Sequence, residues 1–426
     1  MKISAGKVVV IVFVCLVFAA SVVLVGLYFG TQQDPLDLME VPVKELPVSY
    51  RTTVARTGEY LGHPDLVMTA DGSGELIVVY PEGHGRGNII MQRYAITPGE
   101  SELSWNEPEQ NTPESWRTSQ ETPTIYKLNF ADGSSKMVLI SGCPSWNGEE
   151  KANGFNCSVA DGNGYEWTEF TNWYGEEWAK ANGTEPYDII VAMSSLTQMK
   201  DENGNYIDKW MGTFHDYSFT NYYTYLTFDE GGNAVWSEPQ ILVPDQREYY
   251  ADLMMCEVEI VDMGEEWILL GRANARKSNA LACVSYDQGK TWTEMVELPA
   301  CLTGDRHKAE YDETTGKWLI SFRQVLPGQE NIFALDGIMG VGWVAWVGDS
   351  QTLLDLALGD TDGGYGDALI VLGREKDSMT NIDCGYSGTV CSNGVYTLVS
   401  YGEFDNSAIN PYIMAVTFKL SDLGIE

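Results

Sequence analysis

Two residues in the second half of the chain have the chemistry for covalent catalysis, Tyr386 in Cys-Gly-Tyr-Ser-Gly and Glu257 in Met-Cys-Glu-Val. Each stands at the beginning of a short apolar run, where a strand is expected. A phenol is a weak nucleophile until a neighbouring base takes its proton, and a carboxylate is a suitable base. If the fold brings the two side chains together, they can attack an electrophilic carbon.

Further polar residues stand at comparable places in the sequence. A Gly-rich loop carries Glu82, His84 and Arg86, and either Glu82 or His84 could protonate a leaving group. This loop follows one expected strand and leads into another, so it lacks the helix N-terminus of a phosphate cradle. The residues that we expect to contact substrate are Arg272, Arg306, Arg86, His63, Glu121, His215, Asp216, His307 and Asp383.

Six segments must position these side chains, and all six share one pattern. Each has a polar residue, an apolar run, a turn rich in Gly, Asp or Asn, and a second apolar run. The segments begin at His63, Glu121, Ile190, Glu257, Arg306 and Asp383. Their spacing of roughly 50 to 80 residues is typical of propeller blades. The sequence therefore predicts an all-β six-bladed β-propeller, in which the starts of the inner strands converge on one pocket.

One turn has a sharper signature, Ser285-Tyr-Asp287-Gln-Gly289-Lys-Thr291-Trp292. It matches the Asp-box pattern S-x-D-x-G-x-T-W at each defined position, and residues 158–167 and 227–236 are looser copies. We expect the Asp carboxylate to accept backbone N–H groups, the Gly to take a positive φ, and the Trp to pack beneath. These turns are predicted to be structural rather than catalytic.

The Asp boxes and the sixfold layout together resemble the sialidase (neuraminidase) superfamily of BNR-repeat propellers, over residues from about 51 to the end. The resemblance implies that Tyr386 is the nucleophile, that Glu257 is its base, and that Arg272 and Arg306 hold an acidic group of the substrate. Two family features are missing. His63 stands where the family has the first of three arginines, and residues 72–108 lack the Asp that serves as general acid.

The function expected from this resemblance is an extracellular exo-glycoside hydrolase that removes terminal sugars from glycans with retention of configuration. Sialic acid is one candidate sugar. A glycosidase for another sugar and a glycan-binding propeller without turnover are the alternatives. We expect no cofactor and no metal site, and a glycan as the substrate.

Composition excludes other classes of protein. The 426 residues include 61 acidic and 26 basic side chains, so the formal charge of -35 argues against nucleic-acid binding. A hydrophobic fraction of 44% with 12% aromatic residues is far too apolar for a disordered acidic chain.

The first residues form a separate unit. Residues 8–29 carry no charge and follow Lys2 and Lys7, so residues 1–30 are predicted to be a signal-anchor or transmembrane segment. Residues 31–50 are predicted to be a linker and residues 51–426 the propeller. The protein is then a single-pass membrane protein with its propeller outside the cell, or a secreted one if the segment is cleaved. Seven cysteines remain outside this segment, without the spacing of a zinc site, and Cys143 and Cys157 could form a disulfide.

Overall fold

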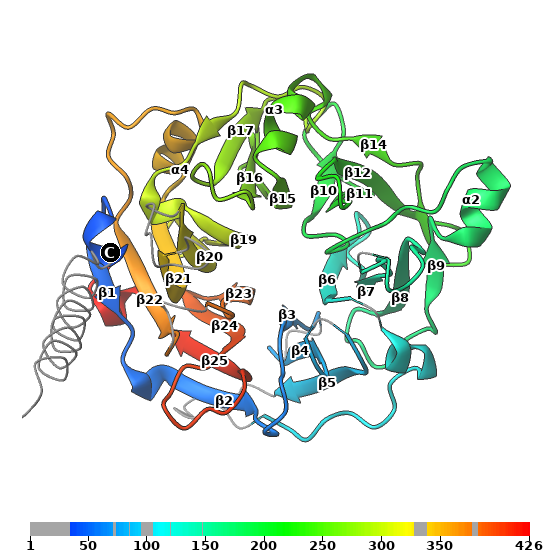
Figure 1. The fold of residues 1–426 in the computed structure, drawn as a ribbon, viewed down its shortest axis with the longest axis horizontal. Helices are drawn as coiled ribbons and strands as arrows, with labels where there is room; N and C mark the ends of the chain where they lie inside the picture. Colours follow the sequence, from blue (N-terminus) through cyan, green and yellow to red (C-terminus); the bar gives the residue numbers. More distant parts are fainter. Residues whose placement is uncertain are drawn as a thin grey trace, which may run out of the picture.

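The strands of the described residues form six sheets arranged in a ring around a central axis (Figure 1). This computed structural model describes residues 35–70, 74–84, 86–94, 105–119, 121–146, 148–327, 339–376 and 382–426. Each sheet is one blade, and its first strand lies nearest the axis; we call that strand the inner strand. The predicted all-β six-bladed propeller is confirmed.

The first three blades come from the first half of the chain. Blade one contains β3 (Asp65–Met68), β4 (Leu76–Pro81) and β5 (Ile89–Tyr94). Blade two contains β6 (Pro123–Asn129), β7 (Ser135–Gly142), β8 (Phe155–Asp161) and β9 (Thr171–Trp173). Blade three contains β10 (Leu196–Lys200), β11 (Tyr206–His215), β12 (Asn221–Phe228), β13 (Ala234–Trp236) and β14 (Gln240–Ile241).

The other three blades follow in chain order, and two of them add a strand from near the N-terminus. Blade four contains β15 (Met255–Asp262), β16 (Trp267–Ala273), β17 (Leu281–Ser285) and β18 (Val296–Glu297). Blade five contains β19 (Gly304–Asp312), β20 (Lys317–Leu326), β21 (Met339–Asp349), β22 (Ala368–Arg374) and β1 (Val43–Glu45). Blade six contains β23 (Gly388–Ser392), β24 (Val395–Gly402), β25 (Tyr412–Phe418) and β2 (Arg51–Ala55).

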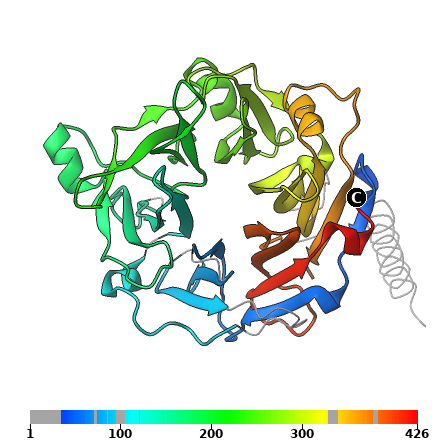
Figure 2. The same ribbon diagram turned by 180° about the vertical axis from the view of Figure 1, so that it is seen from behind.

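The described helices are short and connect strands. The α-helices are α2 (Glu176–Asn182), α3 (Arg247–Asp252) and α4 (Ser350–Ala357). The 3₁₀ helices are η1 (Pro35–Leu38), η2 (Val48–Tyr50), η3 (Glu114–Thr118), η4 (Pro244–Gln246), η5 (Ala300–Leu302) and η6 (Leu420–Leu423). Helix α2 stands outside the ring beside blade two in both views (Figures 1 and 2).

The ring is closed by strands from both ends of the chain. β2 pairs antiparallel with β25, with Arg51 opposite Val416, so the first strand of the propeller joins the last blade. β1 pairs parallel with β22, with Val43 opposite Leu369. The segment expected to be a linker, residues 31–50, is thus packed on the propeller from Pro35 onward. Val41 and Leu46 on either side of β1 are buried at 7% and 2% exposure.

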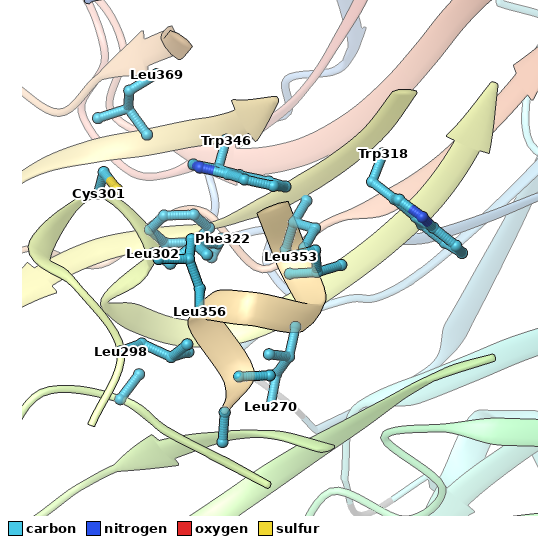
Figure 3. Close-up of a cluster of buried hydrophobic side chains, with 14 of the residues drawn as sticks. Leu270, Leu298, Cys301, Leu302, Trp318, Phe322, Trp346, Leu353, Leu356 and Leu369 are labelled. Carbon is cyan, nitrogen blue, oxygen red and sulfur yellow. The ribbon is translucent and has the colours of Figure 1, made fainter. Parts of the chain in front are cut away.

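The apolar core lies between the blades. A large cluster joins blades four and five, where helix α4 lays Leu353 and Leu356 against Leu270, Phe322 and Trp346 (Figure 3). The second strands of blades one, two, four and five are buried on both faces over most of their length, which explains why they read as continuous apolar runs in the sequence. Packing of this kind fixes the blades relative to one another and so fixes the starts of the inner strands.

The turn between β17 and β18 has the predicted contacts. The carboxylate of Asp287 accepts the backbone N–H of Thr291 at 2.8 Å and its hydroxyl at 2.7 Å. Gly289 has φ +81°, and the indole N–H of Trp292 donates to the Gly289 carbonyl at 3.1 Å. The turn joins the outer strands of the blade, which agrees with a structural role.

Two further expectations concern the predicted membrane segment and a possible disulfide. The predicted membrane segment, residues 1–30, lies outside the described residues, and among the described residues no helix has the length and apolarity needed to cross a membrane. Cys143 and Cys157, which could have formed a disulfide, are both free and buried.

Candidate active site

Backbone bulges aim two of the candidate residues at the axis. In blade four, Cys256 pairs with Arg272 and Glu259 pairs with Leu270, so one extra residue stands in β15 at Glu257. In blade five the same shift places an extra residue in β19 at Arg306. Glu257 and Arg306 have φ values of +51° and +52°, a conformation that non-glycine residues adopt rarely and mostly at functional sites.

The central observation is a three-residue cluster at the starts of blades four and six. The hydroxyl of Tyr386 donates to Oε1 of Glu257 at 2.5 Å. Nη1 of Arg272, from β16, donates to the same Glu257 oxygen at 2.8 Å and to the Tyr386 oxygen at 2.6 Å. Tyr386 is 8% exposed and Glu257 5% exposed. The sequence predicted that these residues would meet, and they do.

The electrostatics of the cluster suit proton transfer. Burial by itself would raise the pKa of Glu257, but the charge of Arg272 and the hydrogen bond from Tyr386 outweigh it and lower that pKa. Burial raises the pKa of Tyr386 well above its usual value, while Arg272 and Arg323 oppose the rise. Tyr386 is therefore a neutral phenol at rest, next to an ionised base and a guanidinium that can stabilise a phenolate.

Asp305 and Arg323 are important residues of the site that the sequence analysis did not single out. Asp305 has no exposed surface and is bound by Arg272, Arg276 and Arg323. The guanidinium of Arg323 lies 5.0 Å from the centre of the Tyr386 ring. A signal for Arg323 exists in the sequence, because it ends the second apolar run of blade five just as Arg272 does in blade four.

His63 occupies the first-blade position and belongs to a buried hydrogen-bond network. Its Nε2 is hydrogen-bonded to the Tyr401 hydroxyl at 3.0 Å and its Nδ1 to the Thr122 hydroxyl at 2.8 Å. Tyr401 donates its own proton to Asp383 at 2.8 Å, so the Tyr401 oxygen accepts from Nε2 and Nδ1 accepts from Thr122. Burial lowers the pKa of His63 to about 3, which agrees with this neutral tautomer.

His84 joins this network from the Gly-rich loop, whereas its neighbours in the loop do not. The His84 ring lies 5.0 Å from that of His63 and 4.9 Å from that of Tyr60. Glu82 is exposed and accepts from the Asn88 side chain at 3.3 Å. Arg86 is 44% exposed in its side chain and pairs with Glu149 on the next blade. Of the two candidate proton donors, His84 lies against other candidate residues, whereas Glu82 does not.

His63, His84 and Asp383 could instead bind a metal ion. They offer one ligand atom each, all within 4.8 Å of one another, a combination that transition metals accept. However, Tyr60 and Tyr401 donate to the two oxygens of Asp383, and both nitrogens of His63 are already hydrogen-bonded. The donor set therefore fits a proton network better than a metal ion.

Two further candidates are buried near charged residues of the site: Glu121 is influenced by Arg306, and His215 by Glu257 and Arg272. Glu121 is 3% exposed, accepts from the Val191 N–H at 3.0 Å, and has a pKa raised to about 7 by burial. His215 is 4% exposed with no partner for Nδ1 among the described residues, and burial lowers its pKa to about 4. The charge of Glu257 also acts on that pKa, so His215 faces the site as a neutral imidazole.

Two other candidates lie elsewhere. His307 follows the bulge at Arg306 and turns away from the axis, where Nε2 is hydrogen-bonded to the Leu302 carbonyl and the ring packs on Phe322. Asp216 holds a tight turn, with bonds from the N–H groups of Ser218 and Thr220. The expected pairing of Asp216 with His215 is absent from the hydrogen bonds of the described residues. We had expected both residues to contact substrate, and their bonds give them structural roles.

A cavity of about 380 Å³ lies in the same channel, lined by inner-strand residues of all six blades. Glu259, Lys308 and Glu310 are its charged residues nearest the bulges, and Tyr386 and Glu257 are not in its lining. It is therefore a separate space from the cluster of Tyr386, Glu257 and Arg272.

Comparisons with known proteins show similarity of fold. No protein-family model matches the chain, and a search of curated proteins finds no match either. A Dyadobacter fermentans protein of unknown function has a TM-score of 0.55 at 14% identity, covering 87% of this chain and 97% of that one.

Sialidases are also among the structures that the chain resembles in fold. Trypanosoma rangeli sialidase with the inhibitor DANA has a TM-score of 0.48 at 12% identity, covering 85% of this chain and 55% of that one. The Ruminococcus gnavus intramolecular trans-sialidase with oseltamivir carboxylate has a TM-score of 0.49 at 12% identity, covering 86% and 96%. Likenesses at these identities concern the fold alone.

Proposed function

We propose that the protein is a glycoside hydrolase that removes a terminal sugar through a covalent intermediate on Tyr386. The observation that supports this proposal is the 2.5 Å hydrogen bond from Tyr386 to Glu257, with Arg272 bonded to both. A binding protein has no need for a phenol held against a buried base, whereas nucleophilic catalysis requires that arrangement.

In the first step, the Tyr386 oxygen bonds to the anomeric carbon while Glu257 takes the phenolic proton. The bond from the anomeric carbon to the leaving oxygen breaks, and that oxygen receives a proton from His84. Arg272 already donates to the Tyr386 oxygen, so it stabilises the negative charge that develops there.

In the second step, a water molecule attacks the anomeric carbon and gives its proton to His84. The bond to Tyr386 breaks, and Glu257 returns the proton to the phenol. Each step inverts the anomeric centre, so the product keeps the configuration of the substrate. We assign the proton transfer to His84 rather than to Glu82 because only His84 packs against the network around Tyr386.

The experiment that tests this function uses the full-length protein and a panel of aryl glycosides, followed by a fluorinated analogue of whichever glycoside is cleaved. We expect release of the aryl group and a glycosyl adduct on the peptide that contains Tyr386, detected by mass spectrometry. Hydrolysis with the adduct on a carboxylate, or on no residue, would overturn the role of Tyr386. A panel that is bound but never cleaved would identify a glycan-binding propeller instead.

We also propose that residues 1–30 anchor the propeller outside the cell. The support is the uncharged stretch of residues 8–29 after two lysines. Fractionation of cells followed by protease treatment of intact cells tests it. The propeller should stay with the membrane fraction and be cut from outside, and a propeller released into the medium would indicate cleavage.

A further inference from the structure

Arg272, Arg306 and Arg323 stand around Tyr386. Arg272 and Arg323 share with Arg276 a carboxylate that belongs to the protein itself. Nη1 and Nη2 of Arg276 bind the two oxygens of Asp305 at 2.5 and 2.7 Å. Arg323 adds contacts at 2.8 Å from Nε and 2.6 Å from Nη2, and Arg272 adds one at 3.1 Å from Nε. Asp305 thus sits among the three guanidinium groups as a bound carboxylate would.

The guanidinium nitrogens of Arg272 and Arg323 that do not contact Asp305 also have internal acceptors. Nη1 of Arg272 is shared by Glu257 and Tyr386, and its Nη2 donates to the Asn274 side chain at 2.6 Å. Nη1 of Arg323 donates to the Ile382 carbonyl at 3.1 Å. An arginine can hold a ligand carboxylate only with N–H groups that are free to donate. Arg323 has an internal partner at each of its three nitrogens. Arg272 has acceptors at both Nη atoms, while its Nε makes only the ion-pair contact with Asp305.

Asp305 is a permanent part of this arrangement. It stands near the start of β19, has no exposed surface, and pairs through the backbone with Arg323 across the sheet. Although burial opposes ionisation, the three arginines lower the pKa of Asp305 far below its usual range. A ligand cannot displace a buried backbone-anchored carboxylate without leaving it unpaired, which is strongly unfavourable.

The fourth arginine differs from the other three. Arg306 is 6% exposed, makes no ion pair within the described part of the chain, and has a buried Nη1 without a hydrogen-bond partner. Its guanidinium lies 6.0 Å from the centre of the Tyr386 ring. It therefore offers its guanidinium to a substrate, and one guanidinium suits a hydroxyl or ring oxygen as well as an acid.

From these contacts we infer that the substrate sugar is uncharged, because Asp305 already fills the arginine cluster that a carboxylated sugar would require. The inference rests on the proposed glycosidase function and specifies its substrate class. The charges of this cluster are almost balanced, with Arg272, Arg276, Arg306 and Arg323 against Glu257, Asp305 and Asp383. Among these four arginines, only Arg306 lacks an ion-pair partner within the described part of the chain, so a sugar carboxylate would have one free guanidinium instead of a cluster, whereas a neutral sugar needs none.

The first test measures kcat/KM of the full-length protein for aryl glycosides of neutral hexoses and pentoses and for the aryl sialoside. We expect at least one neutral glycoside to be cleaved at least 100-fold more efficiently than the sialoside. A sialoside that is the best substrate, or one within tenfold of the best, would overturn the inference. Failure to cleave any glycoside would overturn the proposed function instead.

A binding test further separates the inference of an uncharged sugar from the proposed glycosidase function. Calorimetric titration compares each neutral monosaccharide with the matching uronic acid, which differs only in a carboxylate. We expect the neutral member of the pair to bind at least tenfold more tightly, whether or not turnover occurs. Tighter binding of the acid would overturn the inference even if a neutral glycoside is hydrolysed.

Two variants connect the result to Asp305. Asp305→Asn removes the internal counter-charge, so it should narrow or reverse the preference for the neutral sugar, provided that circular dichroism shows a folded protein. Arg306→Gln removes the unpaired donor, and we expect it to weaken the binding of neutral and acidic sugars by similar factors. A selective loss of the acidic sugar in Arg306→Gln would show that Arg306 is a carboxylate site and would overturn the inference, even if Asp305→Asn fails to fold.

Discussion

The ring of His63 stacks on the ring of Tyr386, with 5.0 Å between the ring centres and 24° between the planes. His63 is held from its other side by Thr122 and Tyr401, so the position of the phenol depends on an imidazole that bridges blades. His63 is therefore proposed as a positioning residue. Its ring is neutral, so it can neither bind an anionic group of the substrate by charge nor act as the proton donor.

A His63→Asn variant tests that role. Asn tolerates the positive φ of +50° at this position, so the backbone should be retained while the stacking is lost. We expect kcat to fall by roughly tenfold with KM within about twofold, because misplacing a nucleophile affects the transition state more than binding. A change in KM alone would mean that His63 contacts the sugar directly.

The proposed roles of Tyr386 as nucleophile and Glu257 as its base are tested by Tyr386→Phe and Glu257→Gln. Each removes one side of the shared hydrogen bond, and each should lower kcat by about 10²–10⁴-fold, the range for loss of proton transfer. The matched control is Tyr206→Phe, on an exposed tyrosine that bonds to Asp262 outside the site. Full turnover by either site variant would rule out the mechanism.

The choice of proton donor is tested within one loop. His84→Gln should reduce turnover strongly for glycosides with poor leaving groups and weakly for those with good ones, because only the former need protonation. Glu82→Gln, two residues away, is the control and should keep its activity, since Glu82 is exposed and bonded to Asn88. The reverse pattern would make Glu82 the acid.

Buried glutamates make the fold sensitive to pH. Burial raises the pKa of Glu121, Glu259, Glu310 and Glu375 to about 7. The folded state then holds protons that the unfolded state releases above its ordinary pKa of about 4.5, so stability falls as the pH rises from about 4.5 to 7.

Urea denaturation at pH 5 and pH 8 measures this effect, and the free energy of unfolding should be greater at pH 5. Glu259→Gln should make the dependence shallower, because the 6% exposed Glu259 carboxylate has one oxygen without a partner among the described residues. Greater stability at pH 8 would show that these carboxyl groups are ionised in the folded protein.

The turn at Asp287 should influence stability without influencing catalysis. Asp287→Ala removes the bonds to the N–H and hydroxyl of Thr291, for an expected loss of about 1–2 kcal/mol in the free energy of unfolding. Glu230→Ala, an exposed residue in the corresponding turn of blade three, is the control. A drop in kcat of the folded Asp287→Ala protein would contradict the structural role.

The blades could be predicted from the sequence because they depend on local patterns. Second strands such as β16 are buried on both faces over most of their length and appear as continuous apolar runs, and the turn at Asp287 is formed by residues close together in the chain. The meeting of Tyr386 and Glu257 followed from the ring, since both stand at inner-strand starts. These features need only period and spacing.

The remaining features depend on contacts between distant segments. Nothing local in Gly-Asp-Arg-His distinguishes Asp305, which becomes buried, from Arg306, which is turned toward the phenol by a bulge. His307 was expected in the site for the same reason, and the bulge sends it to the core instead. Residues 35–50 have the composition of a linker, but β1 finds a partner in β22 far along the chain.

The pairing of β2 with β25 also limits the order in which the propeller can fold during synthesis. β2 (Arg51–Ala55) is made long before its partner strand β25 (Tyr412–Phe418). Until the last blade emerges, β2 has no strand to pair with and the ring cannot close. Until β25 is available, the nascent protein is therefore an open arc with bare strand edges that need protection from pairing with other chains.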